Sequence, residues 1–141
     1  MNFFLAKTEA AAYSIDDLAR EGRTAWSGVR NAQAVRALNQ MQPGDIVLIY
    51  HSTGESSVVG VAKVVSPPRP DPEDPKSAIV DFEFVSRLSE PVTLQTIKQS
   101  GLFADFALVR QSRLSTMPVP ENFIAWLREQ RPELKKLKPL K

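Results

Sequence analysis

Short apolar runs separated by polar turns dominate the first two thirds of the chain. Residues 2–6, 46–50 and 58–65 are almost continuously apolar, which is typical of strands covered on both faces. Residues 80–84 instead alternate between apolar and acidic positions, as in a strand with one face in the core and one in water. The pattern predicts a sheet in which residues 46–50 and 58–65 form a hairpin, where Gly60 permits a bulge or a close approach.

Helical periodicity marks four shorter segments. Residues 14–17 have the spacing of a capping box, and the helix that they begin ends at Gly22. Apolar side chains then recur at helical spacing from residue 32 to residue 41. Two further helices are expected over residues 94–99 and over residues 120–131.

Two other segments carry expectations that bear on the fold. Residues 66–76 hold five prolines and three acidic residues, so we expect an extended, acidic surface loop. Residues 107–110 and 112–115 are expected to form a last strand, which Pro118 and Pro120 end. Strands interspersed with short helices, without a βαβ repeat, indicate one α+β domain with a curved, barrel-like sheet of about five to six strands flanked by short helices.

The charge of the chain is concentrated at its C-terminal end. The 141 residues carry a formal net charge of +2, and four of the 18 basic residues are lysines within positions 135–141. Without these four, 14 basic residues stand against 16 acidic ones. The body is therefore not a strongly cationic platform, and nucleic-acid binding would rest on a local patch plus this tail. We expect the Lys-rich tail, residues 132–141, to be disordered.

Composition excludes several kinds of chemistry. The chain has no cysteine and one histidine, which excludes disulfides, thiolate catalysis, cysteine zinc sites and histidine-rich metal sites. No apolar run is long enough to span a membrane, and the first residues lack the pattern of a signal peptide. We therefore expect a soluble, cytoplasmic protein without a metal or organic cofactor.

The segment from Trp26 to Asn31 has the features of a ligand-holding loop. It offers an aromatic plane at Trp26, a hydroxyl at Ser27 and a guanidinium at Arg30, and Gly28 relieves the backbone between them. Trp26 could stack on a flat ring while Ser27, Arg30 or Asn31 bond its edge. The alternative is that Trp26 anchors the core and Asn31 caps the following helix.

A second group of polar side chains, Tyr50, His51 and Ser52, follows the predicted strand 46–50. These side chains could read the edge of a base. A catalytic alternative would use His51 as general base with Ser52 or Ser115 as nucleophile, but no glycine elbow surrounds either serine. A half-buried, hydrogen-bonded histidine with no functional role is a further alternative.

Several spaced motifs occur in order along the chain: Lys7-Thr8-Glu9, Tyr13 to Leu18, Trp26 to Asn31, Gly44-Asp45, Tyr50-His51-Ser52 and Arg113-Leu114-Ser115. Together they resemble the EVE domain family, which belongs to the PUA-like superfold and is related to the YTH domains that read modified adenine in RNA. The resemblance spans residues 2–127. It implies a PUA-like, barrel-like sheet flanked by helices, and a non-catalytic domain whose pocket accepts a modified base, in this family a modified cytosine in DNA.

The resemblance also implies roles for individual residues. Trp26 would stack in the pocket, residues 50–52 would form the opposite wall, residues 7–9 the mouth, and residues 113–115 would close it. The full set of expected ligand-binding residues is Lys7, Thr8, Glu9, Trp26, Ser27, Val29, Arg30, Asn31, Tyr50, His51, Ser52, Arg113, Leu114 and Ser115. The implied EVE domain covers residues 1–131, and residues 132–141 follow as the tail.

Three functions remain open at this point. The first is a reader of a modified base in DNA, and the second is a module that reads a modified base in RNA. The third belongs to another class, a small hydrolase or nucleotide-processing enzyme that uses His51. The resemblance favours the first, with no enzyme activity, no membrane partner and no cofactor.

Overall fold

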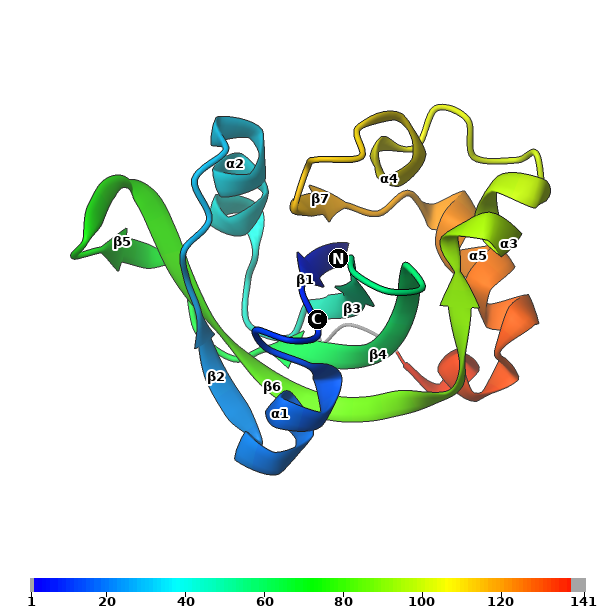
Figure 1. Cartoon of the computed structure of the whole chain (residues 1–141). Helices are drawn as coiled ribbons and strands as arrows, with labels where there is room; N and C mark the ends of the chain where they lie inside the picture. The colour runs from blue at the N-terminus through cyan, green and yellow to red at the C-terminus, as the bar shows by residue number, and fades with distance from the viewer. Residues whose placement is uncertain (1, 138–141) are drawn as a thin grey trace.

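The computed structural model describes residues 2–137 and contains a strongly curved, seven-stranded sheet (Figure 1). The strands are β1 (Phe3–Thr8), β2 (Arg23–Trp26), β3 (Ile46–His51), β4 (Ser57–Val64), β5 (Arg69–Asp71), β6 (Asp74–Thr93) and β7 (Thr116–Pro118). Neighbouring strands follow the order β2-β6-β4-β3-β1-β7, and β5 pairs with β6 outside this path. β1 and β3 are parallel, and the other pairs are antiparallel.

The long strand β6 gives the sheet its shape. It has 20 residues and pairs with β2, β4 and β5. Register shifts near Val58 and Val61 interrupt its pairing with β4, and bulges of this kind bend and twist a sheet. The predicted curved, barrel-like α+β fold is confirmed, although the sheet has seven strands and remains open between β2 and β7.

Helices lie on both sides of the sheet. They are α1 (Ile15–Glu21), α2 (Ala32–Gln40), α3 (Leu94–Gln99), α4 (Ala107–Arg110), α5 (Glu121–Gln130) and the 3-10 helix η1 (Pro132–Lys136). Ser14 and Asp17 form the predicted capping box of α1, and the side chain of Thr93 caps α3. A Cβ atom at Gly60 would approach the Ile15 side chain to 2.5 Å, which confirms the close approach expected there.

The acidic segment 66–76 is not the extended loop that its composition predicted. It forms β5 and the start of β6, joined by a turn in which Asp71 accepts the amide of Glu73 and Asp74 accepts the amide of Lys76. Prolines are compatible with β5 because it is an edge strand that pairs with β6 alone, so its outward positions need no amide donor.

The strand predicted over residues 107–115 is also wrong. Residues 107–110 form the helical turn α4, in which the amides of Val109 and Arg110 both bond the carbonyl of Phe106. Residues 111–115 form a turn, and only residues 116–118 pair with β1 as β7. A single helical turn is too short for its apolar spacing to be distinguished from a strand.

The C-terminal segment is ordered as far as residue 137, whereas the sequence predicted a disordered tail. Residues 132–136 form η1, and Leu134 is 4% exposed because it packs with Leu137 over Phe3 and Ile46. These leucines cover an apolar face of the sheet, which the abundance of lysine obscured in the sequence. Residues 138–141 of the predicted tail lie outside the described residues.

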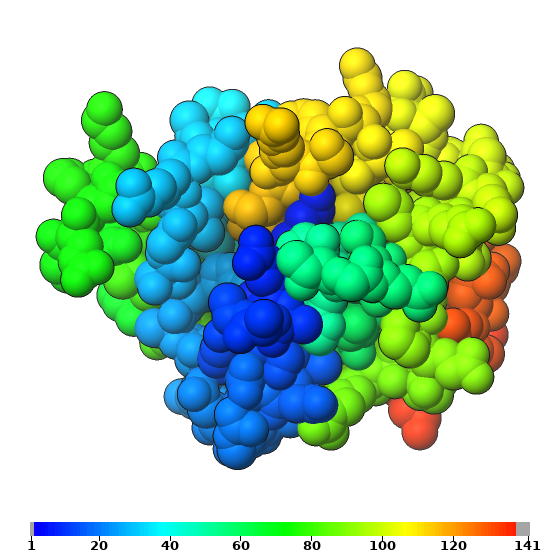
Figure 2. Space-filling model, viewed as in Figure 1, coloured from blue at the N-terminus to red at the C-terminus, as the bar shows by residue number. Residues whose placement is uncertain are grey.

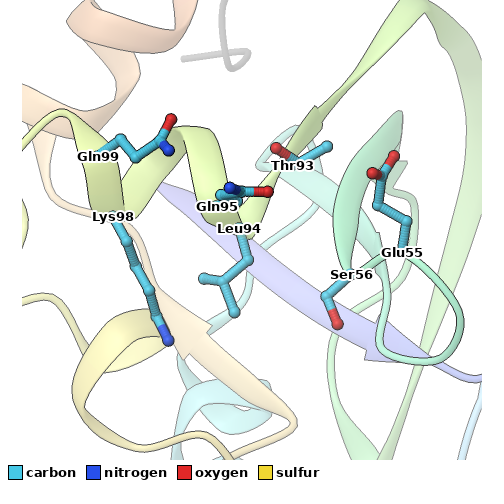
Figure 3. Close-up of a pocket in the computed structure, with 7 residues that line it drawn as sticks. All are labelled: Glu55, Ser56, Thr93, Leu94, Gln95, Lys98 and Gln99. Atoms are coloured by element: carbon cyan, nitrogen blue, oxygen red, sulfur yellow. The ribbon is translucent and has the colours of Figure 1, made fainter.

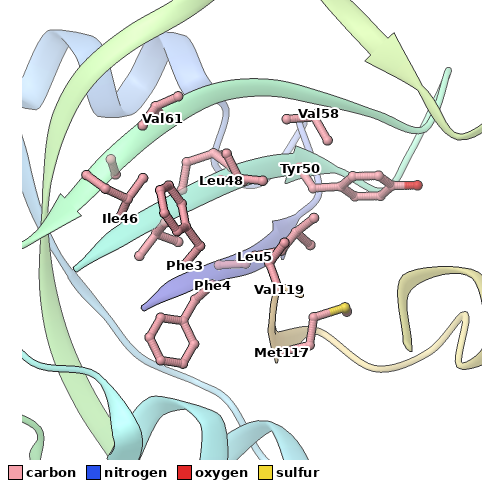
Figure 4. Close-up of a cluster of buried hydrophobic side chains, with 14 of the residues drawn as sticks. Phe3, Phe4, Leu5, Ile46, Leu48, Tyr50, Val58, Val61, Met117 and Val119 are labelled. Carbon is pink, nitrogen blue, oxygen red and sulfur yellow. The ribbon is translucent and has the colours of Figure 1, made fainter. Parts of the chain in front are cut away.

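One polar atom inside this core is unsatisfied. Figure 4 shows side chains of β1, β3 and β4 meeting Met117 and Val119. The neighbouring Thr116 is fully buried, and within residues 2–137 its Oγ1 has no hydrogen-bond partner. A buried hydroxyl in this state destabilises the fold.

We therefore expect Thr116→Val to raise the free energy of unfolding by about 1 kcal/mol, because it removes an unpaired hydroxyl at nearly constant volume. Urea unfolding measured by circular dichroism tests this. The matched control is Thr93→Val, which removes the cap of α3 and should lower stability by about 1 kcal/mol. Destabilisation by Thr116→Val would show that the hydroxyl is paired in solution.

Candidate functional site

A cavity of about 230 Å³ opens where the ends of β1 and β2 meet the segment before α1. Its lining residues are Thr8, Tyr13, Thr24, Ala25, Trp26 and Ser27. The predicted residues Thr8, Trp26 and Ser27 are thus brought together from distant parts of the sequence. Thr24, which precedes Trp26 by two positions on β2, and Tyr13 were not among the predicted site residues.

Two aromatic rings form adjoining walls of this cavity. Trp26 is 8% exposed, and its indole stacks on Phe82 with ring centroids 5.1 Å apart. The ring of Tyr13 meets the indole edge-on, at 6.1 Å and 82°. Trp26 is therefore a core anchor, as one of the two interpretations of the sequence expected, and it also lines the cavity.

Three contacts fix the position of Tyr13. Its hydroxyl donates to Glu21 Oε1 at 2.6 Å, its carbonyl accepts the Thr8 hydroxyl at 2.9 Å, and its amide donates to the Glu9 carbonyl. Burial raises the pKa of the Tyr13 phenol, and the bond to Glu21 adds to this effect. The Tyr13 ring is therefore a neutral wall held in place from three sides.

The rest of the Trp26 loop divides into structural and exposed positions. Asn31 caps α2, since its Oδ1 accepts the amides of Gln33 and Ala34. Val29 is buried, and Gly28 has a φ of 81°, a conformation that favours glycine. Arg30 is exposed and borders a second hollow of about 370 Å³, whose far wall is the acidic β5–β6 turn.

Lys7 and Tyr50 support a neighbouring turn and do not line the cavity. Tyr50 is 2% exposed, and burial raises the pKa of its phenol. The Lys7 ammonium lies 5.5 Å from the Tyr50 ring centroid and donates to the Ser112 carbonyl at 3.0 Å. Burial lowers the pKa of Lys7. This pair thus fixes residues 111–115 against β1.

The predicted closing segment 113–115 continues the pairing of β1 and β7. The Lys7 amide donates to the Ser115 carbonyl at 2.8 Å, so this segment lies beside the end of β1. Leu114 is a core residue with 3% exposure, whereas Arg113 is exposed. In Figure 2, this orange segment, the dark-blue end of β1 and the lighter-blue Trp26 loop surround a depression.

The chain matches the sequence profile of the EVE domain over residues 2–130. It belongs to the EVE domain family. Thymocyte nuclear protein 1 of Gallus gallus is 30% identical to this chain, in an alignment that covers 91% of this chain and 65% of that relative. The chain thus spans slightly less than two thirds of the length of that relative.

Solved structures share the fold of this EVE domain. A protein from Agrobacterium tumefaciens is similar with a TM-score of 0.93 and 29% identity over 100% of both chains. The human THYN1 protein, crystallised in complex with DNA containing 5-methylcytosine, has a TM-score of 0.84 and 23% identity. That similarity covers 99% of this chain and 100% of the human one. These matches confirm the predicted fold class.

A larger hollow of this EVE domain lies elsewhere, beside α3. It measures about 500 Å³ and is lined by Glu55, Ser56, Thr93, Leu94, Gln95, Lys98 and Gln99 (Figure 3). It has no aromatic wall and contains none of the predicted site residues. Of these two hollows, the smaller one offers a flat ring aromatic stacking partners, so size alone does not identify the site.

Neither a metal centre nor a membrane helix is present in residues 2–137. No group of three or more histidine, cysteine or acidic side chains there could hold a metal ion. No helix in this part of the chain is both long and apolar enough to cross a membrane.

His51 holds the cavity wall in position and does not face a nucleophile. Its Nε2 accepts the amide of Ile15 at 3.0 Å, which ties the start of α1 to the end of β3. Nε2 must therefore be unprotonated. In residues 2–137 no serine hydroxyl bonds the His51 ring, and the Ser52 hydroxyl has only a long contact with the Thr8 carbonyl. This arrangement does not favour the hydrolase alternative.

The His51 contact makes stability depend on pH. Burial lowers the pKa of His51 below its usual value of 6.5, and the Asp16 carboxylate opposes this shift. The unfolded state therefore binds more protons, so the stabilisation is complete above the usual pKa and is lost as the pH falls through the folded-state pKa.

We expect the unfolding free energy to decrease as the pH falls from about 7 to about 5, and this decrease to be smaller in His51→Gln. A glutamine oxygen can still accept the Ile15 amide but does not titrate in this range. Urea unfolding at each pH measures the effect. Identical pH profiles for the two proteins would contradict the assigned role of His51.

Proposed function

We propose that this EVE domain is a non-catalytic reader that holds one base of a nucleic acid in the cavity that Trp26 and Tyr13 line. The observation that carries the proposal is the pair of aromatic rings at 82°, beside the residues Thr8, Thr24 and Ser27, in a cavity of about 230 Å³. The rings supply stacking surface, and the hydroxyl-bearing residues supply groups that can both donate and accept hydrogen bonds.

The ligand is a modified cytosine in DNA. The similar human THYN1 protein was crystallised with DNA containing 5-methylcytosine, which supports this choice of base. Stacking contributes about 1–3 kcal/mol per base and tolerates any base, so selectivity comes from the hydroxyl groups and from room for the modifying group. A base in duplex DNA must also be extruded, at a cost of a few kcal/mol.

Tyr13 is a better test of the site than Trp26. Trp26 is a buried core residue stacked on Phe82, so Trp26→Ala would cost about 3–5 kcal/mol of stability and confuse binding with folding. Tyr13 is only partly buried. Tyr13→Ala removes a cavity wall, whereas Tyr13→Phe keeps the ring and removes only the hydroxyl, which bonds Glu21 and Thr24.

We expect Tyr13→Ala to weaken binding of a 5-methylcytosine oligonucleotide by about 5- to 100-fold, because a stacking surface is lost. Tyr13→Phe should bind within about 3-fold of the parent protein, since its ring remains. The measurement is quenching of Trp26 fluorescence in a Trp126→Phe background. Trp126 packs against Phe103 and Phe123 and is not a lining residue of the cavity, so this change leaves one indole reporter beside the site.

Matched oligonucleotides complete the test. Single-stranded DNA and RNA of one sequence, each with cytosine or 5-methylcytosine, separate the DNA reader from the RNA reader. Tighter binding of the modified DNA, lost in Tyr13→Ala, supports the proposal. Equal affinity for all four, or equal binding by the two Tyr13 variants, would contradict it.

A further inference from the structure

Ion pairing divides the cations of this protein into two groups. Six basic side chains have a carboxylate partner: Arg20, Arg23, Lys63, Arg69, Arg87 and Arg131. Their pairs join α1, β2, β4, β5 and β6 and the end of α5. Their charges are locally balanced, so these side chains offer a polyanion little net attraction.

Three exposed arginines, on the Trp26 loop and on the segment that precedes β7, have no ion pair within residues 2–137: Arg30, Arg110 and Arg113. We call them the arginine rim. Arg30 follows the lining residue Ser27 by three positions on one side of the cavity. Arg110 ends α4, and Arg113 follows in the turn that the Leu114 amide closes on the Gln111 carbonyl.

The turn that carries Arg113 is fixed next to the cavity. Lys7 holds it through the Ser112 and Ser115 carbonyls, and the next residue of β1, Thr8, lines the cavity. The segments with Arg30 and Arg113 therefore border the depression from two sides, as the lighter-blue and orange surfaces of Figure 2 show. Other cations without an ion pair in residues 2–137 include Arg36, Lys76 and Lys98, which lie on α2, β6 and α3.

Acidic groups restrict the path of a bound strand. Asp71, Glu73 and Asp74 form the far wall of the hollow beside Arg30, and would repel phosphates there. Two exposed carboxylates, Glu9 and Asp105, lie on segments near the rim and keep its net charge low. Attraction thus depends on a few direct guanidinium contacts.

Of the C-terminal lysines, the two that the structure describes, Lys135 and Lys136, lie far from the cavity. Leu134 and Leu137, on either side of Lys135 and Lys136, pack over Phe3, at the opposite end of β1 from the lining residue Thr8. Five residues of strand separate these ends by about 16 Å. This location differs from the expectation that a tail would share in nucleic-acid binding.

We propose that the arginine rim binds the phosphates of the strand that flank the base in the cavity, with Arg30 on one side of the base and Arg110 and Arg113 on the other. The inference rests on the proposed function and adds to it the path of the strand. Phosphates on both sides of the base would orient it for insertion into the cavity that Trp26 and Tyr13 line, independent of sequence.

Three double variants that each remove two positive charges test the proposal. Arg110→Gln with Arg113→Gln changes the rim. Arg20→Gln with Arg87→Gln changes exposed, ion-paired arginines, and Lys135→Gln with Lys136→Gln changes the C-terminal end. The measurement is the slope of log Kd against log salt concentration, with single-stranded DNA carrying one 5-methylcytosine or one cytosine.

The rim variant should reduce the slope by about 1.4, because each lost phosphate contact on a single strand contributes about 0.7. It should weaken both oligonucleotides equally, so the preference for the modified base persists. The two control variants should leave the slope unchanged. An unchanged slope in the rim variant, or equal reductions in all three, would overturn the proposed path.

The outcome separates this inference from the proposed function. If the parent protein prefers 5-methylcytosine but the rim variant keeps the salt slope of the parent, the proposed function holds and the role of the arginine rim is overturned. If the parent protein binds both oligonucleotides equally but the rim variant has a reduced salt slope, the role of the arginine rim holds and base reading is overturned. No binding to either oligonucleotide would overturn both.

Discussion

The stacking of Trp26 on Phe82 is the contact on which the candidate site depends. β2 has only four residues and pairs with β6 alone, so it needs side-chain packing to stay in place. The 5.1 Å stack inserts the last side chain of β2 into the core beneath β6. Burial of an aromatic side chain of this size stabilises the edge strand and, with it, the rigid wall of the cavity.

The opposite side of the cavity depends on polar contacts. Ser14 caps α1, His51 accepts the next amide of that helix, and Thr8 bonds the carbonyl of Tyr13. The Tyr13 wall is therefore positioned by hydrogen bonds to β1 and β3, whereas the Trp26 wall is positioned by the core. A pre-formed cavity of this kind avoids part of the ordering cost when a ring binds.

The sequence predicted those parts of the fold that local signals control. The caps at Ser14, Asn31 and Thr93 and the apolar strands 46–50 and 58–65 are confirmed because their signals lie within a few residues. The β5–β6 hairpin, α4 and η1 were missed. The β5–β6 hairpin depends on the edge position of β5, and α4 is a single helical turn. The helix η1 depends on Leu134 covering a distant strand. Local sequence pattern reveals none of these.

The candidate site was predictable to a similar extent. The motifs identified Thr8, Trp26 and Ser27, which line the cavity. They also included Tyr50, Val29 and Leu114, which are buried in the core. A motif does not distinguish these two groups, because the direction of each side chain depends on strand register. Tyr13 was overlooked as a site residue because Ser14, beside it, already explained the segment as a helix cap.

The base is held in the cavity lined by the rings of Trp26 and Tyr13, and every other functional conclusion depends on this claim. The most direct test is an NMR measurement of nuclear Overhauser effects from the ¹³C-labelled methyl group of 5-methylcytosine in a bound oligonucleotide. The account predicts contacts from this methyl group to ring protons of Trp26 or Tyr13. Contacts instead to Leu94 and the hollow beside α3, in a saturated complex, would contradict it.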